Sequence, residues 1–259
     1  MATLIAQVGL LVLLNATVGL RAPGWAVGLI FAAVTAALLT HGLSGVRDFG
    51  PADGVTAART VLIGGVAALV ADGFLRPPPL AALVALVAVA LLLDGVDGQV
   101  ARRTGTASPF GARFDMEADS FLLLVLSVHV GRSYGWWVLL IGGMRYAFLL
   151  GIWTLPWMRG QLPPRFWRKV VAATQGVALV VATSGLLPGV AAVALLLAAL
   201  ALLVESFGRD VRWLWRHGHL GRLDHRDLVR PLAVAGRQRD RRRIDAGDRH
   251  QRSPAGGLR

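Results

Sequence analysis

Eight apolar runs, each about as long as a lipid bilayer is thick, constrain the fold of this chain more than any other feature. A helix of about 20 apolar residues crosses the ~30 Å hydrocarbon layer. Because backbone polar groups in lipid must be hydrogen-bonded within the protein, such runs predict an all-α fold, a polytopic transmembrane helical bundle. The runs cover residues 3–20, 24–43, 55–74, 80–100, 112–131, 134–155, 170–187 and 189–207.

The composition agrees with a membrane protein. Hydrophobic residues make up 55% of the 259 residues and charged residues only 16%, whereas soluble domains carry about 25% charged residues. The chain has no cysteine, which excludes disulfides, thiolate metal ligands and a cysteine nucleophile. The first run has no basic segment before it and no A-x-A-like cleavage site after it, so we expect a retained helix rather than a signal peptide.

The distribution of positive charge predicts the orientation in the membrane. Lysine and arginine gather in the cytoplasmic loops of multi-pass proteins. One set of alternate loops and run ends holds nine of these residues, and the other set holds only Arg21, Arg76 and Arg132. We therefore expect a multi-pass protein of the cell inner (plasma) membrane with both termini in the cytoplasm. The formal net charge of +12 reflects this topology, and we expect no nucleic-acid partner.

The C-terminal segment is strongly basic. Residues 205–259 carry 14 arginines and seven acids. Residues 209–216 could form a short amphipathic helix on the membrane, and the part from 237 to 252 has so few apolar residues that it favours disorder. Attraction to anionic lipid head groups is the simplest function for this tail.

Five of the eight acids outside that segment lie within 26 residues. They are Asp94, Asp97, Asp115, Glu117 and Asp119. They occupy the cytoplasmic end of one apolar run and the start of the next. Carboxylates at a membrane boundary are costly, so their presence indicates a functional site.

The spacing of the aspartates places them on facing helix stripes. Asp94 and Asp97 are three residues apart, and Asp115 and Asp119 are four apart. If the two helices form an antiparallel pair, four carboxylates converge, and their mutual repulsion would be relieved by a divalent cation. Without cysteine or histidine in the cluster, the ligand set favours Mg²⁺ or Mn²⁺ over zinc.

Neighbouring residues suit a pyrophosphate ligand. Arg102 offers a bidentate fork for phosphate oxygens. Three small residues leave room for a bulky ligand near the backbone: Gly98, Ala101 and Gly111. Metals, small residues and an arginine together describe a pyrophosphate site.

This pattern, D-x2-D-G-x2-A-R-x8-G-x3-D-x3-D from Asp94 to Asp119, resembles the signature of the CDP-alcohol phosphotransferase (CDP-alcohol phosphatidyltransferase) family at every defined position. The stretch from Pro51 to Arg59 resembles a second family motif, P-N-x-x-T-x-x-R, with Asp53 in place of the usual Asn. The six-helix core of the family would cover residues 53–207. Two transmembrane helices with a cytoplasmic linker would then occupy residues 1–52, and residues 208–259 would form the cytoplasmic tail.

The resemblance implies an enzyme of phospholipid biosynthesis. It would transfer a phosphatidyl group from CDP-diacylglycerol to an alcohol acceptor and release CMP. The metal ligands would be Asp94, Asp97, Asp115 and Asp119, holding two Mg²⁺ or Mn²⁺ ions, with Asp119 also the catalytic base. The residues around the nucleotide would be Thr56, Arg59, Asp97, Gly98, Ala101, Arg102 and Gly111. The resemblance also implies a homodimer.

Four basic residues are candidates for binding the acceptor. Arg145 lies midway along the sixth run, where a lone arginine needs an interior partner. Contact with an acceptor phosphate or with the acids is one interpretation, and a structural ion pair is the other. Arg165, Arg168 and Lys169 begin the seventh run, where they could bind an acceptor phosphate or simply anchor the helix at the cytoplasmic face.

Two alternatives to this function stay open. Within the family, the donor could be another CDP-alcohol, or the acceptor could be a lipid. In a different class, the acids could serve an ion-coupled membrane transporter. Transporters of that kind place such acids near the middle of the bilayer, whereas these lie at one face.

Glu117 is two residues off the stripe of Asp115 and Asp119, which favours a role as an interhelical partner over a role as a metal ligand.

Overall fold

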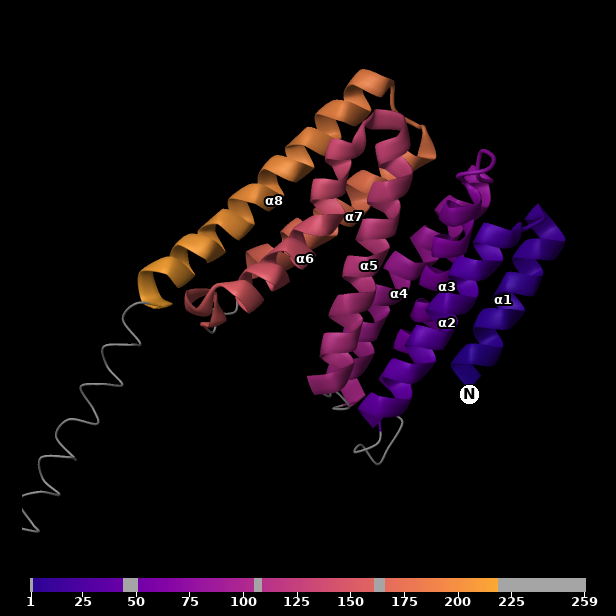
Figure 1. The fold of residues 1–259 in the computed structure, drawn as a ribbon, viewed down its shortest axis with the longest axis horizontal. Coiled ribbons are helices and arrows are strands. Elements are labelled where there is room, and N and C mark those ends of the chain that lie inside the picture. The colour runs from indigo at the N-terminus through magenta and orange to yellow at the C-terminus, as the bar shows by residue number, and fades with distance from the viewer. Residues whose placement is uncertain (1, 44–50, 105–108, 161–165, 219–259) are drawn as a thin grey trace, which may run out of the picture. The chain divides into compact units, whose positions relative to one another are not determined.

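The computed structural model is all-helical in the part of the chain it describes. That part comprises residues 2–43, 51–104, 109–160 and 166–218. Eight α-helices and two short 3₁₀ helices form there, and no strand (Figure 1). The helices are α1 (Ala2–Val18), α2 (Ala22–Leu43), α3 (Pro51–Asp72), α4 (Leu80–Thr104), α5 (Pro109–Tyr134), α6 (Leu139–Thr154), α7 (Phe166–Ser184) and α8 (Gly189–Gly218), with η1 (Trp136–Val138) and η2 (Pro156–Arg159) before and after α6. The eight apolar runs thus become eight helices, and the predicted fold class is confirmed.

Four segments of the described chain are long and apolar enough to cross a membrane, judged by length and composition. They are Ala22–Thr40, Gly54–Asp72, Trp136–Thr154 and Gly189–Arg216. This is fewer than the eight crossing runs that the sequence predicts. The 17-residue α1 is about 26 Å long, short of the ~30 Å layer. Helix α4 carries Asp94, Asp97, Arg102 and Arg103 in its C-terminal half, and α5 and α7 carry charged side chains near their first turns.

Helix α3 occupies the centre of the N-terminal helices. It packs against α1, α2, α4 and α5, and these five helices lie side by side in Figure 1. Its apolar side chains Ile63, Val66 and Leu69 are at most 1% exposed. Because α3 is surrounded by protein, a polar side chain on it faces other helices rather than lipid.

Glycines allow several of these helices to approach closely. A Cβ added at Gly142 of α6 would lie 2.7 Å from the Leu123 carbonyl oxygen and closer still to the Leu124 backbone of α5. The Gly142 N–H donates to the Ser127 hydroxyl, also on α5, at 3.1 Å. Small residues at such crossings let two membrane helices pack backbone to backbone.

The chain divides into two compact units. The larger unit comprises Met1–Leu149 with Pro164–Phe207, and the smaller comprises Leu150–Pro163 with Gly208–Arg259. In the described part of the smaller unit, Met158 and Leu214 are buried, and Gly160 packs against Leu214. Helix α8 runs without a break to Gly218, so residues 209–216 continue this helix. The expectation of a separate short helix there is wrong.

Candidate metal centre and its arginine

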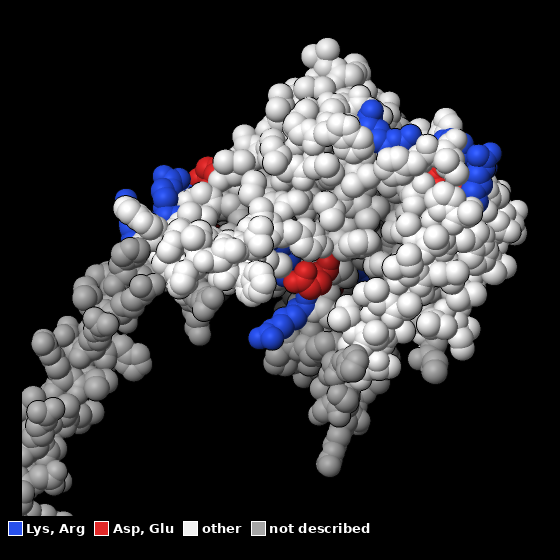
Figure 2. All heavy atoms as spheres, in the orientation of Figure 1, with Lys and Arg blue, Asp and Glu red and all other residues white. Residues whose placement is uncertain are grey.

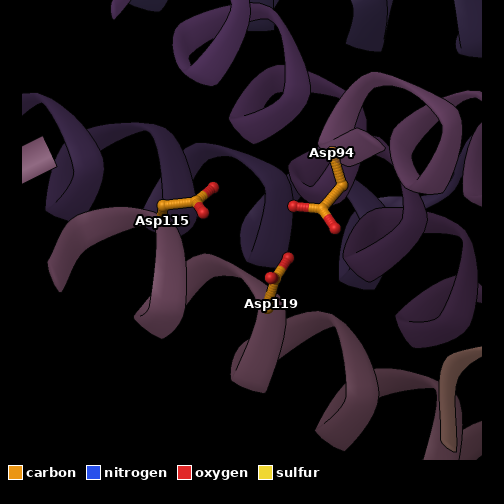
Figure 3. Close-up of side chains that lie close together, drawn as sticks. All are labelled: Asp94, Asp115 and Asp119. Carbon is orange, nitrogen blue, oxygen red and sulfur yellow. The ribbon is translucent and has the colours of Figure 1, made fainter. Parts of the chain in front are cut away.

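Three of the predicted aspartates converge between two helices. Asp94 comes from α4, and Asp115 and Asp119 lie one turn apart on α5. One carboxylate oxygen from each lies within 4.8 Å of the others, and the three side chains point into the space between the helices (Figure 3). Helices α4 and α5 each pack against α3 and α7, so in the described part of the chain the three aspartates meet beside α3 rather than through the expected direct packing of α4 on α5. Asp97 lies one turn beyond Asp94, and its side chain falls outside the described residues.

Arg59 of α3 lies among the three acids. Its Nη1 is 2.9 Å from Asp94 Oδ1, and it also forms ion pairs with Asp115 and Asp119. The Arg59 side chain is 1% exposed, whereas the three carboxylates are between 33% and 44% exposed. One buried cation is therefore shared by three half-exposed anions contributed by two neighbouring helices.

This arrangement has a charge imbalance. A guanidinium buried in a membrane protein requires anionic partners, because desolvating it alone costs several kcal/mol. Three carboxylates around one guanidinium leave a formal charge of −2 among these four side chains. Carboxylates held this close repel one another in a low-dielectric setting. A further positive charge would therefore be attracted to the triad of Asp94, Asp115 and Asp119.

The three acids suit a hard divalent cation. Mg²⁺ binds oxygen ligands at 2.0–2.1 Å, so two ligands on opposite sides of the ion are about 4.2 Å apart. The observed oxygen separations, within 4.8 Å, are close to that span. Each carboxylate contacts Arg59 through its Oδ1 atom, and all three side chains are partly exposed, so a second cation can approach them from the open side. The residues therefore fit a divalent metal together with Arg59.

The group of acids is also distinct at the molecular surface. Figure 2 shows a compact group of acidic side chains on a largely uncharged face, with basic side chains beside it. Glu117 of α5 is half-exposed and lies between Asp115 and Asp119 in sequence. The triad is thus open to a ligand from outside the protein on one side and contacts buried Arg59 on the other.

Other residues predicted for a nucleotide lie on the same helices. Thr56 precedes Arg59 by one turn on α3, where its carbonyl oxygen accepts the Thr60 hydroxyl at 2.7 Å. Gly111 precedes Asp115 by one turn on α5 and is partly buried. The side chains of α4 predicted for the nucleotide, at Asp97, Gly98, Ala101 and Arg102, lie outside the described residues.

Arg145 pairs with Glu117. Its Nη2 contacts Glu117 Oε1, and its Nη1 lies 2.9 Å from the Met116 sulfur. The pair joins α6 to α5, which confirms the interpretation of Glu117 as an interhelical partner. The structure therefore supports the ion-pair interpretation of Arg145, and its guanidinium contacts α5, the helix that carries two of the triad acids.

The other predicted acceptor residues lie at the start of α7. Lys169 is exposed and Arg168 is partly buried, and α7 packs against α4 and α5, the two helices of the triad. Arg165 lies outside the described residues.

Sequence reasoning placed Arg59 near the nucleotide and missed its contact with the acids. A signal was present, because Arg59 lies inside an apolar run. An arginine in such a position needs carboxylate partners. The nearest ends of apolar runs that are rich in acids are those of α4 and α5.

Comparison with known proteins supports this description. The family model for CDP-alcohol phosphatidyltransferases matches residues 49–205. Two curated relatives match a shorter segment, and both are named CDP-diacylglycerol--serine O-phosphatidyltransferase, from Helicobacter pylori strains 26695 and J99. Each is 44% identical over 55 residues, which is 19% of this chain and 23% of the relative. The chain therefore matches less than a quarter of the length of these relatives.

No solved structure gives a significant match to this chain. The family model nevertheless covers more than half of the sequence, and it includes α3, α4 and α5 with Arg59 and the whole triad. The apolar helices and the family together describe a multi-pass membrane protein. The chain belongs to the CDP-alcohol phosphatidyltransferase family.

Proposed function

We propose that this protein transfers a phosphatidyl group from CDP-diacylglycerol to an alcohol acceptor and releases CMP, as a step of phospholipid biosynthesis. The observation that carries the proposal is the convergence of Asp94, Asp115 and Asp119 around Arg59 within the family region. A charged pyrophosphate on a membrane-anchored donor requires a positively charged site at the membrane surface, and a metal-loaded triad would supply one.

In the proposed reaction the acceptor oxygen attacks the phosphorus atom of the phosphatidyl group. A new phosphorus–oxygen bond forms to the acceptor, and the phosphoanhydride bond to CMP breaks, with CMP leaving with the electron pair. Asp119 takes the proton from the acceptor hydroxyl. Its carboxylate suits this role because it is 38% exposed and can therefore reach a hydroxyl at the open side of the triad.

Two divalent ions, Mg²⁺ or Mn²⁺, are proposed as cofactors, held by the triad together with Asp97. When bound, they would neutralise the charge on the pyrophosphate and on the leaving CMP. Arg59 would hold the three carboxylates from the buried side and keep these partly exposed groups directed at the open side.

The nucleotide is proposed to lie along the ends of α3, α4 and α5 that carry these acids. Thr56 and Arg59 would line one side, and Gly111 would allow close approach from α5. On α4, the proposed contacts are Asp97, Gly98, Ala101 and Arg102. The fork of Arg102 would bind a phosphate of the pyrophosphate group.

The acceptor is proposed to bind near Arg145, Arg165, Arg168 and Lys169. Serine is the first acceptor to test, because both curated relatives are named as serine enzymes. The pairing of Arg145 with Glu117 also supports an acceptor without a phosphate, since Glu117 already neutralises one of these four cations.

The proposed location is the cell inner (plasma) membrane, with the triad and both termini on the cytoplasmic side. Support comes from the distribution of charge, since lysine and arginine gather at the same helix ends as the triad. A homodimer and contacts of the basic tail with anionic lipids belong to the same proposal.

The test is CMP release by purified protein in lipid vesicles containing CDP-diacylglycerol. Serine, glycerol phosphate and inositol phosphate would be supplied separately, with Mg²⁺, with Mn²⁺ and with a chelator. We expect metal-dependent CMP release with one acceptor. No release with any acceptor would reject this function, and release from a different CDP-alcohol would favour the alternative donor. Metal-dependent ion flux without CMP release would favour the transporter.

A further inference from the structure

The two helices that precede the family region contact α3, which carries Arg59, and α5, which carries two of the three acids. We call α1 and α2, residues 2–43, the N-terminal hairpin; the family match begins at residue 49. Both helices of the hairpin pack along α3, which carries Arg59. Helix α2 also reaches α5, where Phe31 stacks on Phe121 with ring centroids 5.1 Å apart. Phe121 is two residues from Asp119 in sequence, so this contact lies close to the triad.

The packing between the hairpin and α3 leaves little room to slide. A Cβ added at Gly64 of α3 would lie 2.5 Å from the Gln7 side-chain oxygen of α1. The Gln7 side chain is 2% exposed. On α2, a Cβ added at Gly24 would lie 3.0 Å from the Ala68 carbonyl oxygen of α3. The close approach at Gly24 and the buried Gln7 side chain against Gly64 hold the helices in one axial register, because a shift along the helix would bring larger side chains to these contacts.

A buried acid fastens the hairpin to the far end of α3. The Asp72 side chain is 3% exposed. Its Oδ1 accepts the backbone N–H of Arg21, in the turn between α1 and α2, at 2.8 Å. Its Oδ2 accepts Arg76 Nε at 2.9 Å. Arg76 in turn donates through Nη2 to the carbonyl oxygens of Val18 at 2.6 Å and Gly19 at 2.5 Å, at the end of α1.

This joint has more hydrogen bonds than a simple surface ion pair. Charged donors and acceptors that are buried make strong hydrogen bonds, and losing one partner leaves the other unsatisfied. Asp72 and Arg76 therefore tie the start of α2, the end of α1 and the end of α3 together. Arg59 and Asp72 lie on the same helix, about 20 Å apart along its axis.

We propose that the N-terminal hairpin is a positioning element for the metal centre, and that Asp72 and Arg76 are the positioning residues through which it holds α3. The guanidinium of Arg59 contacts three carboxylates at once, and a rotation or slide of α3 by a fraction of a turn would break that geometry. The hairpin holds α3 along its middle, at Gly64 and Ala68, and at its C-terminal end, at Asp72, and it contacts α5 through Phe31. The catalytic consequence rests on the proposed function, but the effect on packing does not.

The absence of cysteine allows a direct test of packing by alkylation. Ala118→Cys places a thiol at a buried position on α5 between Asp115 and Asp119, and Ala182→Cys places one at a buried position on α7. We expect Asp72→Leu and Arg76→Met to raise the alkylation rate of the α5 thiol by about tenfold and to leave the rate of the α7 thiol unchanged. Arg76→Lys, which keeps the charge, should restore part of the protection. If Asp72→Leu does not fold, Asp72→Asn serves as the milder variant.

The matched control is Asn15→Ala, which alters an exposed side chain of the hairpin whose oxygen accepts a hydrogen bond, at 3.5 Å, from Trp25 Nε1 of the hairpin itself. It should leave both thiols protected. Unchanged alkylation of the α5 thiol in both Asp72→Leu and Arg76→Met would overturn the proposal. An equal rise at the α5 and α7 thiols would also overturn it, because that result indicates general loosening.

Activity gives the second measurement. The same variants should lower kcat for CMP release several-fold and raise the Mg²⁺ concentration needed for half-maximal rate, while KM for the acceptor changes little. If the unaltered protein releases no CMP with any acceptor, the proposed function fails, whereas the alkylation result still decides whether the hairpin positions α5 and α3.

Discussion

Arg145 of α6 forms an ion pair with Glu117 of α5. In sequence, Glu117 lies between Asp115 and Asp119, the two triad acids of α5. The pair lies partly open to the surroundings, since Glu117 is 50% exposed and Arg145 is 26% exposed. Glu117 therefore neutralises part of the positive charge that Arg145 would present to the proposed acceptor.

Replacing Glu117 by Gln should favour acceptors that carry a phosphate. The substitution keeps the size of the side chain but removes the charge that neutralises Arg145. We expect KM for glycerol phosphate to fall by about three- to tenfold, in line with the modest energy of a half-exposed ion pair, while KM for serine changes less. Steady-state kinetics with both acceptors measure this effect. Arg145→Met should abolish the gain when it is combined with Glu117→Gln, and persistence of the gain would assign it to another cation.

Replacing Arg59 by Met should destabilise the protein and increase its response to metal. The three carboxylates would lose their buried partner, and their repulsion would no longer be offset. Because the carboxylates are partly exposed to solvent, we expect the free energy of unfolding to fall by about 2 kcal/mol, which lowers the melting temperature by about 4–8 °C. Added Mg²⁺ should recover more stability in this variant than in the unaltered protein. Melting curves with and without Mg²⁺ test this, and an equal Mg²⁺ response in both proteins would contradict it.

The response to excess metal should distinguish the roles of the triad acids. Asp94→Asn removes one proposed ligand, so we expect a reduced rate that rises again at high Mg²⁺ concentration. Asp119→Asn removes the proposed base as well, and we expect a loss of about 10²- to 10⁴-fold that excess Mg²⁺ does not repair. CMP release measured across a Mg²⁺ titration distinguishes the two. Recovery of Asp119→Asn to the level of Asp94→Asn would show that Asp119 serves only as a ligand.

Adjacent glycines on α6 provide a matched pair for helix packing. A Cβ at Gly142 would collide with the α5 backbone at Leu123 and Leu124, whereas a Cβ at Gly143 would meet nothing within 4 Å. Gly142→Ala should therefore destabilise the protein by about 1–3 kcal/mol, and Gly143→Ala should be neutral or slightly stabilising because alanine favours helix. Thermal melting in detergent or vesicles compares them. Equal melting temperatures would show that the α5–α6 crossing can relax.

The positions of the helices were largely predictable from the sequence, and so was the meeting of the triad. Apolar runs of nearly bilayer length, separated by turns rich in Gly and Pro, allow few alternatives to a bundle. The aspartate spacing at the facing ends of two consecutive helices indicated that Asp94 would meet Asp115 and Asp119, and the structure brings them together through the packing of both helices on α3. Both inferences depend on residues that are near one another in sequence.

The features that could not be predicted from the sequence are contacts between segments far apart in the chain. Arg59 is 35 residues before Asp94, and nothing in its local pattern states which side of α3 faces α4 and α5. The end of α8 was missed for a different reason. The change from apolar to charged residues near Phe207 marks a change of surroundings, but arginine and leucine both favour helix, so the helix continues through it.

The central place of α3 also bears on how the chain enters the membrane. A chain is synthesised from its N-terminus, so α1 and α2 are present before α3 emerges. A lone helix carrying Arg59, Thr60 and Asp72, all buried in the finished protein, would expose costly polar groups to lipid. With the hairpin already in place, Asp72 meets the Arg21 N–H on arrival, and only the Arg59 end of the helix must wait for α4 and α5. The Arg59 end of α3 is therefore synthesised first and is the last to meet its partners.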